Sequence, residues 1–122
     1  MNEPSVSQSS PILFRIGWWL LAFVLAAFAV NHIAGIWFIA SSTDEAQMFE
    51  LMGALNLFAL VVLVIPYRRW EVWAWWAMWI AIVPVALVLV FAGGGIGLTY
   101  AVTALVMAAA QLMTLPSFQA TP

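Results

Sequence analysis

The sequence contains no cysteine, no lysine and very little charge of either sign. Without cysteine, the chain can form no disulfide, no thiolate metal site and no thiol-based active site. Only 7% of its residues are charged, whereas a water-soluble domain carries about 25%. Together with the 66% hydrophobic composition, this excludes a water-soluble fold, because so apolar a surface would associate in water. The net charge of −2 gives no reason to expect a nucleic-acid partner.

Four long apolar runs make up most of the chain, and its 3 arginines and 5 acidic residues lie near or beyond their ends. A helix needs about 20 mainly apolar residues to cross the hydrocarbon core of a bilayer. We therefore predict an all-α fold, an integral membrane four-helix bundle forming one domain over residues 12–115. The expected spans are 12–40, 46–65, 70–91 and 96–115, with polar tails at 1–11 and 116–122.

Capping and helix-breaking residues mark the borders of these runs. Ser42 or Thr43 is expected to cap the second helix, and Pro66 to end it. The glycines at 93–95 separate the third helix from the fourth, and Pro116 is expected to stop the fourth. The N-terminal tail lacks a basic segment, so we expect the first helix to be retained and not cleaved as a signal peptide.

The basic residues predict the orientation of the chain in the membrane. Arg15, Arg68 and Arg69 fall on one side if all four runs span, whereas Asp44 and Glu45 fall on the other. Because arginine accumulates on the cytoplasmic side, we expect both termini to be cytoplasmic. The chain is then a multi-pass protein of the cell membrane, that is, the inner or plasma membrane.

A tryptophan-rich segment surrounds the arginine pair and is interpreted as an interface anchor. Arginine binds anionic head groups, and tryptophan prefers the membrane–water interface. A carboxylate in the first turn of the third helix favours the helix dipole and can pair with an arginine. The anchor comprises Arg68, Arg69, Trp70, Glu71, Trp73, Trp75 and Trp76. A docking edge for another subunit is the alternative interpretation.

The segment from Tyr67 to Ala77 reads Tyr-Arg-Arg-Trp-Glu-Val-Trp-Ala-Trp-Trp-Ala. It resembles the Tyr-Arg-Arg-Gly-Glu-x-Trp-Ala-Trp-Trp motif of small, functionally uncharacterised bacterial membrane proteins that have four helices in a loosely DoxX-like arrangement. Trp70 stands where that motif has glycine, which disfavours a tight turn there. The resemblance implies the four-helix fold and a bacterial membrane location, and it implies no chemistry.

Polar side chains inside the runs are the first place to look for function. One face of the fourth helix carries Thr99, Tyr100, Thr103, Met107, Gln111 and Thr114. We interpret this face as one that hydrogen-bonds and packs against neighbouring helices, with a small ligand pocket as the alternative.

Small and polar residues also recur along the first two helices. The first carries Ala27, Asn31 and Gly35, and the second Glu50, Gly53 and Asn56. Small residues let helix backbones approach, and we expect Asn31 and Asn56 to hydrogen-bond across that contact. His32, the only histidine, is expected near Glu50 at the outer interface, either as a hydrated polar cap or as a proton-handling pair.

The sequence thus favours a non-enzymatic membrane protein, either a structural or accessory subunit of a larger membrane complex or a homo-oligomer. Its expected partners are the lipid bilayer, other membrane subunits and copies of itself. No cofactor or metal is expected, and a single histidine cannot supply two axial haem ligands. Two alternatives remain: a small oligomeric transporter or channel, and a quinone- or pigment-associated redox subunit framed by Met107 and Tyr100.

Overall fold

The computed structural model describes residues 11–92 and 94–119, and all regular structure in these ranges is helical. The elements are α1 (Pro11–Phe38), α2 (Thr43–Val64), the short 3-10 helix η1 (Tyr67–Arg69), α3 (Val72–Ala92) and α4 (Gly94–Gln119). Each of the four α-helices is long and apolar enough to cross a membrane. The predicted all-α four-helix membrane bundle is therefore confirmed, and the length and composition of its helices indicate a multi-pass membrane protein.

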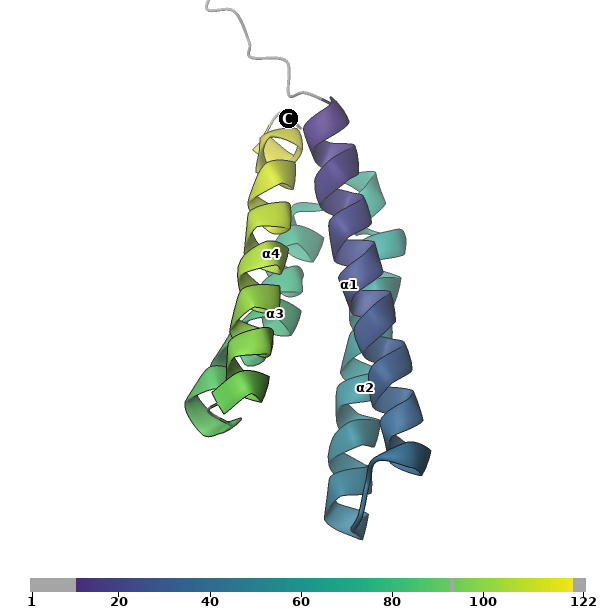
Figure 1. Cartoon of the computed structure of the whole chain (residues 1–122). Helices are drawn as coiled ribbons and strands as arrows, with labels where there is room; N and C mark the ends of the chain where they lie inside the picture. Colours follow the sequence, from purple (N-terminus) through teal and green to yellow (C-terminus); the bar gives the residue numbers. More distant parts are fainter. Residues whose placement is uncertain (1–10, 93, 120–122) are drawn as a thin grey trace, which may run out of the picture.

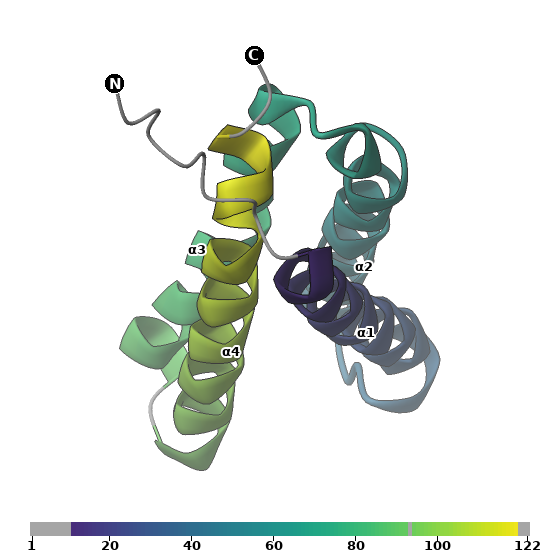
Figure 2. The same ribbon diagram turned by 90° about the horizontal axis from the view of Figure 1, so that it is seen from above.

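The helices form two antiparallel hairpins, α1 with α2 and α3 with α4 (Figure 1). The start of α1 and the end of α4 lie at the same end of the bundle (Figure 2). We call this the arginine end, because all three arginines of the chain lie there, Arg15 near the start of α1 and Arg68 and Arg69 in η1. The opposite end, where the first turn of α2 carries Asp44 and Glu45, is called the acidic end.

The hairpins pack together near the arginine end and diverge toward the acidic end (Figure 1). Contact between them runs mainly through α1 and α4, whereas α2 and α3 touch much less. Gly17 permits the close approach, because a Cβ atom there would collide with the Ala110 carbonyl oxygen and the Thr114 side chain of α4. The bundle is consequently tight at one end and open at the other.

The start of α2 follows the capping chemistry expected from the sequence. Ser42 is the N-cap residue, and its hydroxyl accepts a hydrogen bond from the Glu45 backbone N–H at 3.2 Å. The Glu45 carboxylate in turn accepts from the Ser41 backbone N–H and hydroxyl, both at 2.7 Å. The Ser42 bond satisfies one of the backbone donors that a helix start leaves free, and the two Ser41 bonds fix the residue before the cap.

Two local features differ from the sequence-based expectation. α4 continues through Pro116 to Gln119, beyond the predicted end at Leu115. Phe118 explains the continuation, because it is 5% exposed and its ring centre lies 4.8 Å from that of Tyr67. Packing of this last turn outweighs the loss of one backbone donor at the proline.

The second difference lies at Trp70, where the resemblance has glycine. A tight turn forms there nonetheless: Trp70 has φ 58° and ψ 32°, and its N–H donates to the Tyr67 carbonyl at 3.0 Å. This left-handed conformation costs a non-glycine residue of order 1–3 kcal/mol. The Trp70 ring packs edge-on against Phe14, with centres 6.2 Å apart, which helps to hold it.

Candidate functional site

Polar side chains between the helices gather in two clusters. The closed cluster, near the arginine end, comprises Tyr67, Trp75, Gln111 and Thr114. The open cluster, nearer the acidic end, comprises His32, Asn56 and Tyr100. The sequence pointed to members of both, but it gave no indication that they belong to separate groups.

The closed cluster forms a compact hydrogen-bond network. The Tyr67 hydroxyl donates to Gln111 Oε1 at 2.8 Å and lies 2.5 Å from Thr114 Oγ1. Gln111 Nε2 donates to the Trp75 carbonyl at 2.7 Å, and Trp75 Nε1 donates back to the Gln111 carbonyl at 3.3 Å. Tyr67, Gln111 and Thr114 are all 0% exposed. The network therefore joins η1, α3 and α4 and leaves no room for a ligand.

The open cluster is built around His32 on α1. His32 Nδ1 lies 2.7 Å from the Phe28 carbonyl, which can only accept, so Nδ1 carries a proton. Neutral His32 then offers an acceptor lone pair at Nε2, 3.5 Å from the Tyr100 hydroxyl. Asn56 Nδ2 donates to the Met52 carbonyl at 2.8 Å. Asn56 Nδ2 also lies 3.3 Å from His32 Nδ1. Because both nitrogens are donors, this is a van der Waals contact between the amide and the ring and not a hydrogen bond.

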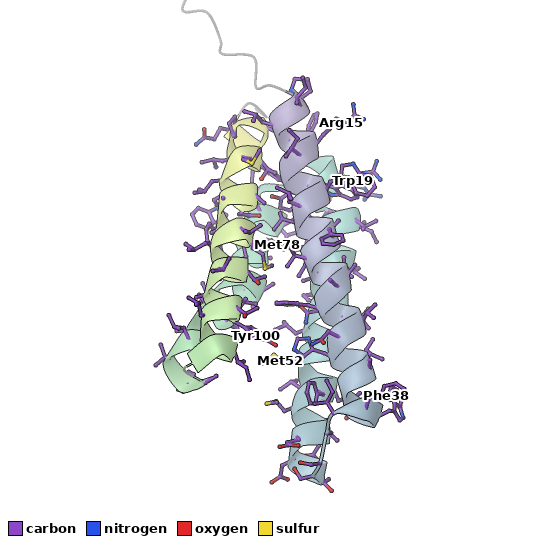
Figure 3. The ribbon with its side chains drawn as sticks, viewed as in Figure 1. Arg15, Trp19, Phe38, Met52, Met78 and Tyr100 are labelled. Atoms are coloured by element: carbon purple, nitrogen blue, oxygen red, sulfur yellow. The ribbon has the colours of Figure 1, made fainter. Side chains whose placement is uncertain are left out.

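The open cluster lines a cavity of about 540 Å³ between the diverging hairpins. All four helices contribute, and most of the wall comes from apolar side chains of α2 and α3. Figure 3 shows Met52 of α2 and Tyr100 of α4 at the gap between the hairpins. The apolar part of the wall includes Phe28, Met48, Met52, Leu55, Val85, Leu87, Val88, Phe91 and Ile96.

Asn31 does not occupy the position expected for it. It is exposed on α1, as is Ala27, whereas His32 and Gly35 are buried. The expected contact between Asn31 and Asn56 is consequently replaced by one between His32 and Asn56. The reason is the rotation of the helix. Successive side chains on an α-helix point about 100° apart, so Asn31 and His32, although adjacent in sequence, face different sides of α1.

Glu50 and Thr103 also lie outside the open cluster. Glu50 is exposed, and along residues 11–92 and 94–119 no hydrogen bond or ion pair joins it to His32. The Phe49 ring occupies that side instead, with its centre 6.0 Å from that of His32. The Thr103 hydroxyl donates to the Thr99 carbonyl of its own helix at 2.9 Å, so it does not link helices.

The tryptophan-rich anchor divides between surface and core. The Arg68 guanidinium lies 5.4 Å from the Trp18 ring centre, a cation–π geometry. Glu71 accepts from Trp73 Nε1 at 2.6 Å, and the described part of the chain shows no ion pair between Glu71 and an arginine. Trp75 is only 5% exposed and belongs to the closed cluster. The remaining anchor residues, Arg69, Trp70 and Trp76, are exposed.

The sequence offered a ligand pocket on the polar face of α4 as an alternative, and of that face Tyr100 alone is among the described residues that line the cavity. The larger part of its wall, on α2 and α3, was not predicted, because divergence of two hairpins leaves no periodic signal in either. Met48 and Met52 are the one sequence feature that could have indicated this part of the cavity, since flexible thioether side chains often line adaptable apolar sites. In the residues that the structure covers, no group of His, Asp or Glu side chains could hold a metal ion. Comparison with known protein families, curated proteins and solved structures gives no match for this chain.

Proposed function

We propose that this chain is a non-enzymatic, multi-pass protein of the bacterial inner membrane that works in association, as an accessory subunit of a larger membrane complex or as a homo-oligomer. The arginine end faces the cytoplasm, and both termini are cytoplasmic. The distribution of arginine supports this orientation. The resemblance of the Tyr67–Ala77 segment to small DoxX-like membrane proteins agrees with a bacterial membrane location and remains a prediction.

The observation that carries this proposal is the exposed amide of Asn31. Asn31 lies about 10 Å along α1 from Phe38, within the apolar part of the helix. Its side chain makes no hydrogen bond to the other residues described. Facing hydrocarbon, the amide would leave its donors and acceptor without partners, whereas a bond to another helix is worth roughly 1–2 kcal/mol. The neighbouring exposed Ala27 leaves space for that helix to approach.

The test is affinity purification of a tagged chain in mild detergent, followed by mass spectrometry and measurement of the mass of the complex. We expect the wild-type chain to purify as a stoichiometric complex or a discrete homo-oligomer. Asn31→Leu should dissociate it, because the amide hydrogen bond is lost. Val30→Leu, at the adjacent position that is 69% exposed, is the matched control and should keep the complex. A wild-type monomer, or an Asn31→Leu chain with unchanged partners, would contradict the proposal.

A second candidate, a subunit that carries a quinone or a pigment, is favoured by the cavity. Its volume of about 540 Å³ lies within the roughly 300–1,000 Å³ typical of small-molecule sites. An absorption spectrum of the purified chain, together with mass spectrometry of an organic extract, tests this candidate. A chromophore or quinone present at one copy per chain would support it, and an extract containing neither would count against it.

A further inference from the structure

The wall of the cavity is apolar except for one small group of polar side chains. Among the described residues that line it, only His32, Asn56 and Tyr100 contribute polar side chains, and none is a carboxylate or an arginine. A strongly polar solute or a bare ion would lose its hydration there without compensation. The chemistry of the wall therefore selects an amphiphile, with an apolar body and one small head that hydrogen-bonds.

Tyr100 and His32 form an incomplete donor–acceptor pair. The Tyr100 hydroxyl and His32 Nε2 are 3.5 Å apart, whereas a well-formed bond from a hydroxyl has a length of about 2.7–2.8 Å. The hydroxyl proton of Tyr100 and the lone pair of His32 are thus both weakly engaged. The Asn56 amide nitrogen is already engaged, because it donates to the Met52 carbonyl at 2.8 Å.

We propose that this cavity binds the carboxyl head of a single-chain fatty acid. One carboxyl oxygen accepts a hydrogen bond from the Tyr100 hydroxyl, while the O–H of the other oxygen donates a hydrogen bond to His32 Nε2. Two oxygens on one carbon can bridge groups that are 3.5 Å apart, so both partners are satisfied with little movement. If the proton moves to Nε2, carboxylate and imidazolium remain hydrogen-bonded to each other, and no isolated charge is buried.

Other lipid head groups use this pair less well. A quinone carbonyl has a single oxygen and no proton to give, so the His32 lone pair stays unpaired. An alcohol must donate and accept at one oxygen atom, which requires Tyr100 and His32 to move apart. Of these three heads, the carboxyl group is the one that completes both bonds in the observed geometry.

The acyl chain has a defined path along α2 and α3. Met48, Met52, Leu87, Val88 and Phe91 line this part of the cavity. Because α2 and α3 touch little, the chain can enter sideways from the lipid. The head at His32 then lies about 9 Å along α1 from Phe38.

The test uses the full chain in phosphatidylcholine nanodiscs titrated with radiolabelled hexadecanoic acid, with hexadecan-1-ol and a decyl-substituted benzoquinone as competitors. We expect saturable binding of one acid per chain, and displacement by either competitor that is at least tenfold weaker than displacement by unlabelled acid. Tyr100→Phe should weaken acid binding about tenfold, the effect of one lost hydrogen bond. Tyr67→Phe is the matched control, because it removes the only other tyrosine hydroxyl and lies outside the cavity.

Val88→Phe provides a second variant, because it fills the cavity and leaves the polar pair in place. It should abolish saturable binding, with circular dichroism showing an unchanged helix content. Equal affinity in wild type and Tyr100→Phe, or acid binding that survives Val88→Phe, would overturn the proposal. A preference for the quinone would also overturn it and would support the second candidate above. The assay uses the isolated chain, so failure to find a protein partner leaves its result unaffected.

Discussion

The two tyrosines of this chain occupy opposite environments. Tyr67, in the closed cluster, is 0% exposed, and its hydroxyl has partners at 2.8 and 2.5 Å. Tyr100, in the open cluster, is half-buried, and its hydroxyl has one contact at 3.5 Å. The difference follows from helix divergence: where the hairpins meet, protein groups satisfy one another, and where they separate, hydrogen-bonding capacity is left for a ligand.

The largest expected effect is the loss of the closed cluster. Gln111→Ala removes a donor and an acceptor and leaves a small void, so we expect a loss of unfolding free energy of about 3–5 kcal/mol. Denaturation in mixed micelles, followed by tryptophan fluorescence, measures it. Gln47→Ala, at an exposed site of α2, should change stability by less than about 0.5 kcal/mol. Similar losses of unfolding free energy in both variants would contradict the structural role assigned to the Gln111 amide.

A smaller effect is expected where the hairpins touch. Gly17→Ala places a methyl group against the Ala110 carbonyl oxygen, a backbone atom that cannot move aside, and should cost about 1–3 kcal/mol. Gly95→Ala is the control, because nothing lies within 4 Å of a Cβ atom there and alanine favours the helix. A Gly17→Ala protein as stable as wild type in the same unfolding assay would show that the tight approach of α1 to α4 is dispensable.

The tyrosine pair gives the most direct test of the comparison. Tyr67→Phe leaves buried partners of its hydroxyl unsatisfied and should lower the unfolding free energy by about 1–3 kcal/mol. Tyr100→Phe breaks only a long contact and should change it by less than about 0.5 kcal/mol. Parallel unfolding curves in the absence of added lipid ligand measure both. If Tyr100→Phe proved the more damaging, the open cluster would be structural.

The smallest effect is expected at the acidic end. Ser42→Ala removes the hydroxyl that accepts from the Glu45 N–H, and should cost about 0.5–1 kcal/mol. The loss should be local, because the first turn of α2 is exposed and lies away from the closed cluster. Amide hydrogen exchange should therefore accelerate in the first turn of α2 and stay unchanged in α4. Faster exchange in both helices would mean that the two ends are coupled.

The sequence predicted the helices well because membrane spanning imposes a strong and local requirement. Run lengths and capping residues located all four helices, and the prediction failed where tertiary packing decides, as at Pro116 and Trp70. Packing around Phe118 and Phe14 overrides the backbone preference at those positions. Neither effect can be read from a short stretch of sequence.

The candidate site was less predictable, since it depends on helix rotation and on the angle between hairpins. His32, Asn56 and Tyr100 were singled out as polar residues inside apolar runs, yet Asn31 was placed on the wrong face of α1. Without charged residues along the middle of α1, its polar pattern is too sparse to fix the rotation. The cavity arises from the separation of α2 and α3, for which the sequence carries no signal.

The divergence of the hairpins also affects the surrounding membrane. The two hairpins lie close together at the arginine end and apart at the acidic end (Figure 1), so the bundle has the outline of a wedge that would displace unequal lipid areas from the two leaflets. Such a wedge sits with least elastic cost where the bilayer curves toward its narrow end. We therefore expect the geometry that opens the cavity to make the protein sensitive to membrane curvature, and an occupant that draws the hairpins together to weaken that sensitivity.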